Sequence, residues 1–319
     1  MKSYIRPCVL AALAAFTFCA QAWPDKPVRI IVPYPPGGAV DVVTRKMAAK
    51  LQEQTGQTFF VENKSGATGT IGLSSVVQAA PDGYTLAAND TTYALLPHIF
   101  KKLPFDHEKD LLPVGAYVFA PMGVVVKADS KFKTLGDLVA AAKVEANRVS
   151  YGTGGAGSAP HFVSEALGIA AGANFLHVPF KGAGPALQDV VAGRVDVLFD
   201  QVSSSSSFIE QGRVTPLAVS STERWKSLPQ TPTFIESGLS TFAITNFTGL
   251  VAPAGTPPEI VGILQRAAAT ALEDEAVKKS FASMGVQAVG EGPAQFSQLI
   301  REDLQRWAAL IRDKGIKLD

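Results

Sequence analysis

Short runs of apolar residues alternate with segments of helical periodicity along most of the chain. In the first third, the apolar runs predict strands at residues 28–32, 58–62 and 85–88, and the periodicity predicts helices at residues 39–54 and 70–80. A Pro-Asp-Gly turn at residues 81–83 leads into the third strand. Strands separated by helices of this length form parallel βαβ units, so this part of the chain is predicted to be an α/β layer structure.

A second series of the same kind follows an apolar run at residues 124–126. It predicts strands at residues 149–151, 175–179 and 195–199, and helices at residues 134–145, 160–171 and 183–191. The end of the chain differs. After a strand at residues 249–252 it predicts three helices, at residues 257–273, 275–284 and 293–314, with little sheet between them.

A helical tail without its own sheet must pack on another part of the molecule. We expect it to return to the first series, so that the chain crosses between two lobes near residues 124–127 and again near residues 247–251. The first lobe would then comprise residues 23–124 and 249–319, and the second lobe residues 125–248. Two crossings give a hinge and a cleft, the geometry of lobe closure around a ligand. The alternative is one large doubly wound domain.

The first 22 residues have the layout of a secretory signal peptide. Lys2 and Arg6 give a positive start, residues 9–18 are an apolar run, and Ala20-Gln21-Ala22 is a small-x-small cleavage site before Trp23. The run is too short for a bilayer-spanning helix, which needs about 20 apolar residues. Lipid attachment at Cys19 is disfavoured because Phe18 precedes it. The leader predicts a periplasmic protein.

Cleavage of the leader changes the composition in two ways. Both cysteines, Cys8 and Cys19, are lost, so the mature chain has no residue for a disulfide or a thiolate site. Loss of Lys2 and Arg6 leaves 27 basic residues where the full chain has 29, against 28 acidic residues, so the net charge changes from +1 to −1. A nearly neutral chain lacks the basic footprint of a nucleic-acid-binding protein.

Loops rich in glycine and small polar residues follow the predicted strands. They cover residues 35–38, 66–70, 89–92, 152–158 and 181–184, and most of them open a predicted helix. Glycine lets a backbone approach a ligand closely, and helix N-termini present unpaired N–H groups with partial positive charge. Ligands of open α/β sheets bind at the carboxyl ends of the strands, where these loops fall. A single loop of this kind is usually only a tight turn, whereas several together indicate an anion site.

Other kinds of chemistry find little support in the sequence. Residues 152–157 fit the G-x-G-x-x-G pattern, but the strand that should end in an acidic residue runs into Pro179-Phe180-Lys181, so no dinucleotide cofactor is expected. The four histidines are scattered without a metal-ligand spacing, so no metal site is expected. Asp200 follows a strand and either points into the cleft or caps the next helix.

A hydrolase with a serine nucleophile and a histidine base is the remaining enzymatic hypothesis. Ser158 and His161 are three residues apart at the start of a predicted helix. The chain has no G-x-S-x-G elbow, and this spacing fits a helix cap followed by a first-turn side chain better than a hydrolase. We therefore expect no enzymatic activity, with a secreted Ser/His hydrolase as the weaker alternative.

Six motifs are distributed along the chain. They are Val32-Pro33-Tyr34-Pro35-Pro36-Gly37-Gly38 with Asp41, Val61-Glu62-Asn63-Lys64-Ser65-Gly66-Ala67, Ala80-Pro81-Asp82-Gly83-Tyr84-Thr85-Leu86, His177-Val178-Pro179-Phe180-Lys181-Gly182, Gly193-Arg194-Val195-Asp196 and Ala252-Pro253-Ala254-Gly255-Thr256-Pro257. Together they resemble the motifs of the Bug family (Bordetella uptake gene products), the extracytoplasmic receptors of tripartite tricarboxylate transporters. The resemblance covers the whole mature chain in order.

The resemblance implies an α/β fold of the two-lobed periplasmic-binding-protein type II, with each lobe a mostly parallel sheet flanked by helices. It implies a monomer that captures a dicarboxylate, tricarboxylate, amino acid or aromatic acid and delivers it to membrane permease subunits. Carried onto matching positions, the expected ligand-binding residues are Tyr34, Pro36, Gly37, Gly38, Asp41, Ala67, Thr68, Gly69, Thr91, Thr153, Gly154, Gly157, Ser158, His161, Lys181, Gly182 and Asp200. A sensor that docks on a membrane signalling protein is the alternative role for the same fold.

The chain departs from the family pattern in two places. Residues 89–92 are Asn-Asp-Thr-Thr where the family usually has serine and glycine, and Asp90 adds a negative charge near an anion site. After Asp200, Gln201 and the serine run at residues 203–207 stand where the family often has asparagine and proline. These departures leave room for a cationic or amide group in the distal half of the ligand.

Overall fold

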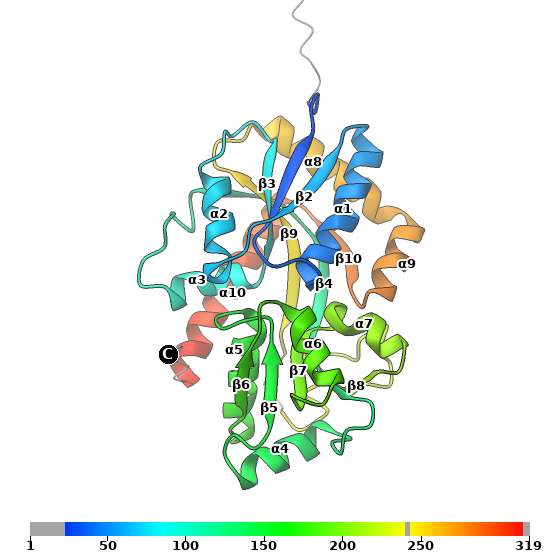
Figure 1. Cartoon of the computed structure of the whole chain (residues 1–319). Coiled ribbons are helices and arrows are strands. Elements are labelled where there is room, and N and C mark those ends of the chain that lie inside the picture. The colour runs from blue at the N-terminus through cyan, green and yellow to red at the C-terminus, as the bar shows by residue number, and fades with distance from the viewer. Residues whose placement is uncertain (1–22, 240–242, 315–319) are drawn as a thin grey trace, which may run out of the picture.

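The structure is a computed structural model that describes residues 23–239 and 243–314. The predicted signal peptide at residues 1–22 lies outside the described residues. Within the described ranges, no helix combines the length and the apolar character needed to span a bilayer. The chain forms two α/β lobes, drawn above and below one another in Figure 1. The predicted two-lobed α/β fold class is confirmed, but the sheets are mixed and not mostly parallel, because every strand pair that involves β4 (Leu111–Lys127) or β9 (Thr245–Pro253) is antiparallel.

The upper lobe in Figure 1 contains the start of the described chain, whereas the last helix, α10 (Pro293–Lys314), runs from the upper lobe to the side of the lower lobe, where the described chain ends beside α5 (Ala159–Ala171). Its elements are β1 (Val28–Val32), α1 (Ala39–Thr55), β2 (Phe59–Asn63), the 3-10 turn η1 (Ala67–Gly69), α2 (Thr70–Val77), β3 (Thr85–Asp90), α3 (Thr92–Ile99), β9 (Thr245–Pro253), α8 (Pro258–Glu273), α9 (Glu275–Ser283), β10 (Gln287–Glu291) and α10 (Pro293–Lys314). Strands β2, β1 and β3 pair in parallel, and β3 continues the sheet to β9 in the antiparallel sense.

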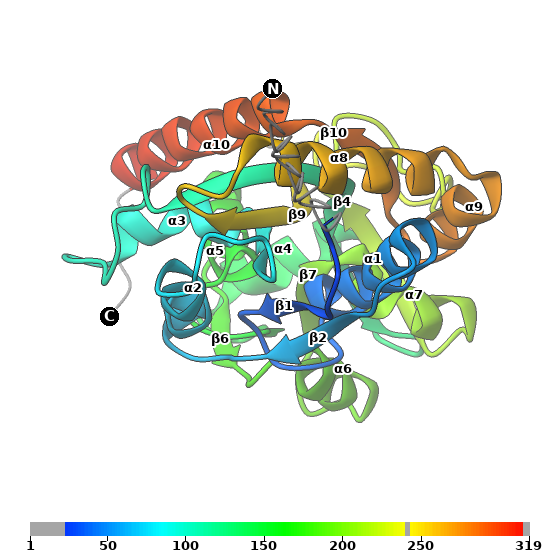
Figure 2. The same ribbon diagram turned by 90° about the horizontal axis from the view of Figure 1, so that it is seen from above.

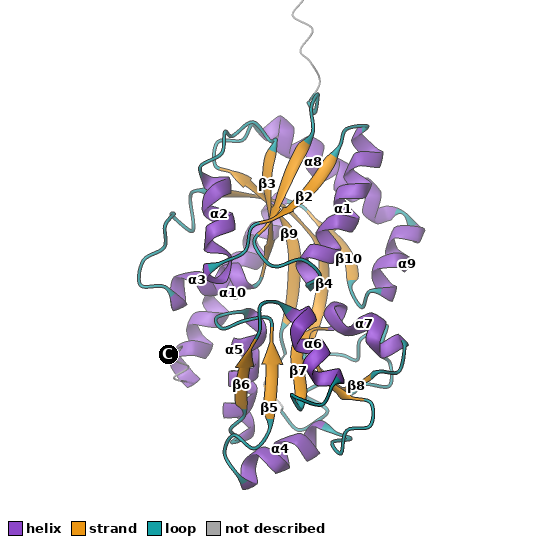
Figure 3. Ribbon diagram, viewed as in Figure 1, coloured by secondary structure: helices purple, strands orange, loops and turns teal. Residues whose placement is uncertain are grey.

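The lower lobe has the same layered construction. Its elements are α4 (Leu135–Val144), β5 (Ser150–Thr153), α5 (Ala159–Ala171), β6 (Leu176–Pro179), α6 (Ala183–Val191), β7 (Val197–Gln201), α7 (Val202–Glu210) and β8 (Val214–Val219). Strands β6, β5 and β7 pair in parallel. Helices cover both faces of the sheet in each lobe (Figure 3).

One long strand, β4 (Leu111–Lys127), belongs to both sheets. It pairs with β9 as far as Pro121 and with β7 from Met122 onward, while β8 pairs with its last residues. The partner change in β4 therefore falls between Pro121 and Met122. The strand order is β2-β1-β3-β9-β4-β7-β5-β6, with β8 and β10 also attached to β4.

Alternation along the strands fills a separate core on each face of each sheet. In β1, Val28, Ile30 and Val32 join a cluster with α1 and α8, while Ile31 joins one with α2, α3 and α10. In β7, Val197 and Phe199 likewise face α5. Because successive side chains of a strand point to opposite faces, a continuous apolar run is what a sheet covered on both sides requires.

Helix α10 packs on both lobes. Its first half contributes Phe296 and Ile300 to a core of the upper lobe, where they are buried. Further along, Trp307 is fully buried in the main core of the lower lobe, with its ring centroid 6.2 Å from that of Phe162 in α5. In the view from above, α10 runs along the edge of the molecule opposite α6 (Figure 2).

Most predicted elements are confirmed to within a few residues. As far as Lys314, the tail has three helices with little sheet between them, as expected, and its one short strand, β10, pairs with β4. Helices α3 and α7 and strand β8 were not predicted. The serine run 203–207 lies inside α7, where serine's tendency to hydrogen-bond local backbone masks the helical signal. Helix α3 contains Pro97, which reads as a helix breaker.

Candidate functional site

A small pocket lies where loops of the two lobes meet. Its volume is about 80 Å³, enough for a few water molecules. The lining residues are Tyr34, Pro35, Gly38, Ala39, Val40, Asp41, Asp90 and Thr92 from the upper lobe, and Gly154, Ser158, Pro160, Gly182, Ala183, Asp200 and Gln201 from the lower lobe. None of these residues is basic.

Five helices begin at the wall of this pocket. Gly38, Ser158, Gly182 and Gln201 are the N-cap residues of α1, α5, α6 and α7, and Thr92 is the first residue of α3. Larger depressions exist elsewhere on the described surface, including one of about 520 Å³ beside Trp225. The volume of a depression does not identify the candidate site. The small pocket is identified by its converging helix N-termini, because their N–H groups and dipoles favour an anion.

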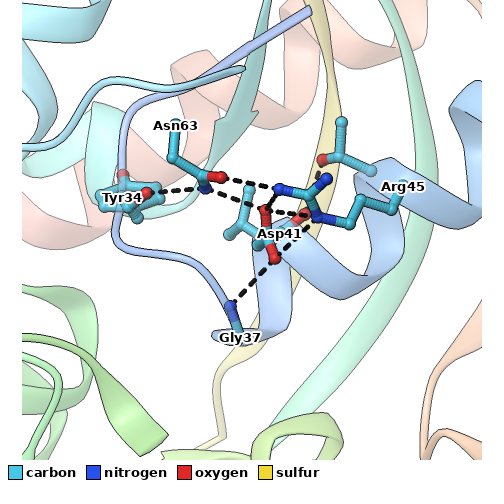
Figure 4. Close-up of polar contacts among 7 residues, drawn as sticks. Tyr34, Gly37, Asp41, Arg45 and Asn63 are labelled. Carbon is cyan, nitrogen blue, oxygen red and sulfur yellow. Dashed lines mark hydrogen bonds and ion pairs between the residues drawn. The ribbon is translucent and has the colours of Figure 1, made fainter. Parts of the chain in front are cut away.

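Asp41 holds the loop that joins β1 to α1 (Figure 4). Its Oδ2 accepts a hydrogen bond from Gly37 N at 2.9 Å, and its Oδ1 accepts bonds from Arg45 Nε at 3.0 Å and from Asn63 Nδ2 at 2.8 Å. Asn63 Nδ2 also donates to Tyr34 O at 3.0 Å. The network therefore fixes the loop at residues 34 and 37, at its two ends.

Both oxygens of the Asp41 carboxylate are thus used within the protein. Burial by itself would raise the pKa of Asp41, but the hydrogen bonds from Arg45, Gly37 and Asn63 outweigh it and lower that pKa below 3.8. The carboxylate stays charged at neutral pH, and its role in this geometry is to position the Gly37-Gly38 backbone. It contributes to the pocket wall without an unused acceptor.

Asp90 joins several elements at the end of β3. It is 4% exposed and accepts hydrogen bonds from Tyr34 Oη at 2.6 Å, from Thr92 N at 3.2 Å and from Thr92 Oγ1 at 3.2 Å. Thr92 Oγ1 in turn accepts a bond from Ala159 N of α5 at 3.3 Å, across the two lobes. Burial raises the pKa of Asp90 to about 6.

Asp200 lines the same pocket as Asp90, but from the lower lobe. It is 7% exposed, and its Oδ1 accepts hydrogen bonds from Gln201 N at 2.7 Å and Ser204 Oγ at 3.0 Å. The sequence suggested that Asp200 either points into the cleft or caps the next helix. Both hold in part, because one carboxylate oxygen bonds the start of α7 and the residue also lines the pocket. Burial, and to a smaller degree the negative charge of Asp90, raise the pKa of Asp200 to about 6.

Glycines bring the loops of the two lobes into contact. Gly182 has φ +106°, and a Cβ there would lie 3.3 Å from Pro35 Cβ of the upper lobe. Gly157 has φ +77°, and a Cβ there would lie 3.0 Å from Thr68 Oγ1. Both positions need glycine for the left-handed backbone and for the close approach.

Stacked rings support the 154–158 loop. The centroids of Tyr151 and His177 lie 4.8 Å apart, and those of His177 and His161 lie 4.0 Å apart. His161 Nδ1 accepts a hydrogen bond from Gly157 N at 3.2 Å. Burial lowers the pKa of both histidines, that of His177 to about 4, so both rings are uncharged at neutral pH.

The geometry does not pair Ser158 with His161. The Ser158 hydroxyl donates to Gly155 O at 2.7 Å, and the imidazole Nδ1 is occupied by Gly157 N. A hydrolase of this kind needs the base within hydrogen-bond reach of the nucleophile. Ser158 does stand at the N-cap of α5, as expected, although its side chain does not bond the helix.

The structure brings together only part of the predicted site. Tyr34, Gly38, Asp41, Gly154, Ser158, Gly182 and Asp200 line the pocket. The other predicted residues lie in neighbouring loops, helices and strand ends without lining it: Pro36, Gly37, Ala67, Thr68, Gly69, Thr91, Thr153, Gly157, His161 and Lys181. Thr91 is fully buried, and its hydroxyl accepts a bond from Phe247 N of β9 at 3.3 Å. Thr92, its neighbour, lines the pocket instead.

Residue-by-residue reasoning missed Arg45 and Asn63, which reach the pocket only through Asp41. Asn63 ends β2, at the sheet edge where the ligand loops of α/β proteins gather, and that position was the available signal. Across residues 23–239 and 243–314, the structure gathers no group of three or more side chains suited to bind a metal ion.

Comparison with known proteins places this geometry among transport receptors. The model of the tripartite tricarboxylate transporter family receptor matches residues 43–316. BugT of Bordetella pertussis is 33% identical over 301 residues, covering 94% of this chain and 92% of BugT. Two solved structures of Rhodopseudomonas palustris proteins are also similar. Rpa4515 with adipate has a TM-score of 0.89 at 29% identity (92% and 99% of the two chains), and MatC with bound malate has 0.85 at 30% identity (91% and 100%).

Proposed function

The chain belongs to the tripartite tricarboxylate transporter receptor family, and we propose that it captures a small organic carboxylate in the pocket between its lobes. The resemblance of its motifs to the Bug family is thereby confirmed, and the members of this family are solute-binding receptors. The observation that carries the proposal is the convergence of five helix N-termini on a pocket with no basic side chain. Asp90 and Asp200 already bond the starts of α3 and α7, so the starts of α1, α5 and α6 are the ones left for a ligand. Main-chain N–H groups and helix dipoles supply the positive potential there.

The similar structures support the same class of ligand. Adipate and malate, the molecules bound by the two Rhodopseudomonas palustris proteins, are both small dicarboxylates. We propose that one carboxylate of the ligand lies against the first turns of α1, α5 and α6, at Gly38, Ser158 and Gly182. We further propose a periplasmic location after removal of residues 1–22, and delivery of the ligand to membrane permease subunits.

Charge, more than shape, should govern binding if the helix N-termini hold the ligand. Malate or adipate at about one hundred times its dissociation constant would stabilise the protein by about 2.7 kcal/mol, or roughly 5 °C in melting temperature. The corresponding diamides, which match the acids in shape, should leave the melting temperature unchanged. Differential scanning fluorimetry of the mature chain measures both. Equal stabilisation by acid and amide would contradict the anion site.

Lobe closure is the second expected property. The upper lobe would comprise the elements before the partner change in β4 together with those after β9 begins, and two connecting strands would act as the hinge. Small-angle scattering should show a smaller radius of gyration with saturating malate than without it. An unchanged radius, with binding established independently by calorimetry, would favour a single rigid body.

A further inference from the structure

We propose that the ligand of this receptor carries an ammonium group, which binds between Asp90 and Asp200, in addition to the carboxylate held by the helix N-termini. The inference rests on the proposed function, since it concerns the other end of the same pocket. It narrows the ligand from any small carboxylate to an amino carboxylate. Asp90 and Asp200 would be the residues that determine this specificity.

Asp90 and Asp200 are two buried carboxylates in the wall of one small pocket. They are 4% and 7% exposed, and they approach from different lobes. All of their hydrogen-bond donors are neutral groups: the Tyr34 hydroxyl, the Thr92 and Gln201 amides, and the Thr92 and Ser204 hydroxyls. Neither carboxylate forms an ion pair among the described residues.

Neighbouring cations are already engaged or point elsewhere. Arg45 bonds Asp41 and Asn63, and Arg306 pairs with Asp303 on α10. Lys181, the basic residue nearest in sequence to the pocket loops, is exposed and does not line the pocket. The starts of α3 and α7 give Asp90 and Asp200 one N–H donor each but no full positive charge, and a buried charge without a counter-ion is costly.

Asp200 also keeps an acceptor directed at the pocket. Its Oδ2 makes no hydrogen bond with the described residues, whereas Oδ1 accepts two. A Cβ placed on Gly154, which lines the pocket, would lie 3.7 Å from this Oδ2. The unused oxygen is therefore close to the space that a ligand would fill. An ammonium group, with three donors and one positive charge, fits that requirement.

A dicarboxylate would fit the same place less well. Its second carboxylate would meet two acidic side chains, and the complex would need an additional proton to separate the charges. Burial raises the pKa values of Asp90 and Asp200 to about 6 each, because it disfavours their charged forms more than the neutral hydrogen-bond donors favour them. An ammonium ligand supplies that stabilisation directly, while its carboxylate still reaches the helix N-termini.

Matched pairs of ligands test the proposal by calorimetry, in buffer containing EDTA. β-Alanine and γ-aminobutyrate replace one carboxylate of succinate and glutarate by ammonium, and aspartate adds ammonium to succinate. We expect at least one ammonium-bearing probe to bind about tenfold or more tightly than its dicarboxylate partner, about 1.4 kcal/mol or more. Dicarboxylates that bind as tightly as all three would overturn the inference while leaving the carboxylate site intact. If no carboxylate binds, the proposed function itself is wrong.

Two isosteric variants assign the effect to the two acids. Asp90→Asn and Asp200→Asn keep an oxygen acceptor for Tyr34 and Gln201 but remove the charge. Each should weaken the ammonium probe by about tenfold and narrow or reverse its advantage over the dicarboxylate. Asp129→Asn, at an exposed position beside Lys127, is the matched control and should change neither affinity. Unchanged selectivity in both site variants, with normal melting temperatures, would contradict the assignment.

A pH series separates an ammonium ligand from a protonated dicarboxylate complex. Between about pH 5 and about pH 8, the affinity for an ammonium probe should rise as Asp90 and Asp200 lose their protons, whose pKa values are about 6. Tyr34 also faces Asp90, but its pKa lies well above this range. The pKa of Asp303 on α10 is also about 6, so the same series on Asp303→Asn measures how much of the pH dependence comes from Asp303. Dicarboxylate affinity that instead falls over this range, and exceeds that of the ammonium probes, would overturn the proposal.

Discussion

Replacing Gly157 by valine is expected to weaken malate binding by about ten- to a hundredfold. The Cβ position of Gly157 lies 3.0 Å from Thr68 Oγ1 and 3.5 Å from Ile99 Cδ1, and both of those residues belong to the other lobe. A branched side chain would hold the lobes apart, and overpacking of this kind costs about 1–3 kcal/mol. The penalty falls on the closed arrangement, which is the one that surrounds a ligand. Calorimetry with malate measures the loss.

Backbone strain at Gly157 must be separated from the clash across the lobes. Gly157 has φ +77°, so any side chain there also costs about 1–2 kcal/mol for a left-handed backbone. Gly212→Val is the matched control, because Gly212 has φ +66° in the same lobe and no atom within 4 Å of its Cβ position. The control should lower the melting temperature to a similar degree and bind malate normally. Normal binding by Gly157→Val would show that these loops do not close on the ligand.

Replacing Asp41 by alanine is expected to destabilise the protein by about 2–4 kcal/mol at neutral pH and to abolish malate binding. The substitution leaves Gly37 N without an acceptor and removes one partner each from Asn63 and Arg45. Hydrogen bonds to charged groups contribute about 1.5–3 kcal/mol each, whereas the N–H group of the exposed Gly37 can bond water in the variant. The loop at residues 34–37 would lose the anchor that fixes its shape. Urea unfolding and calorimetry measure the two effects.

The pH dependence of this effect has a definite sign. Because the pKa of Asp41 is lowered from 3.8 in the folded protein, its stabilisation is fully present above about pH 4 and is lost as the pH falls through the folded-state value. The difference between the wild type and Asp41→Ala should therefore shrink below about pH 4. Asp189→Ala, which breaks a more exposed pair with Arg194, is the control and should cost about 0–1 kcal/mol. If Asp41→Ala lowers the free energy of unfolding by no more than Asp189→Ala does, Asp41 does not stabilise the loop as argued.

Local sequence pattern was sufficient to predict most of the elements and the side of the sheet on which the pocket loops lie. Alternation in β1 and the glycine loops after β1, β5 and β6 are properties of neighbouring residues, and these expectations agree with the structure. Local sequence pattern could not predict contacts between loops that are far apart in the chain. The bond from Tyr34 to Asp90 joins residues 56 positions apart, and nothing in either loop alone announces it.

The other predictions that failed concern which residue of a loop faces the pocket. Thr91 was chosen for the site, but the chain turns into α3 at Thr92, which rotates Thr91 toward β9 and presents Thr92 to the pocket. The glycine-rich segment at residues 66–70 was expected at the ligand, whereas Thr68 lies against Gly157, behind the pocket wall. A shift of one residue at a helix start changes which side chain faces a cleft, and sequence patterns do not fix that start so closely.

The position of Trp307 has a consequence for the order in which the molecule can be assembled during synthesis. This side chain is fully buried in the core of the lower lobe, although α10 follows every other described element in the chain. A nascent chain that already contains all of β5, α5 and β7 still has an apolar hollow beside Phe162. Neither lobe can reach its final packing until the ribosome has added α10, so the elements made before α10 remain incompletely packed until that helix is present.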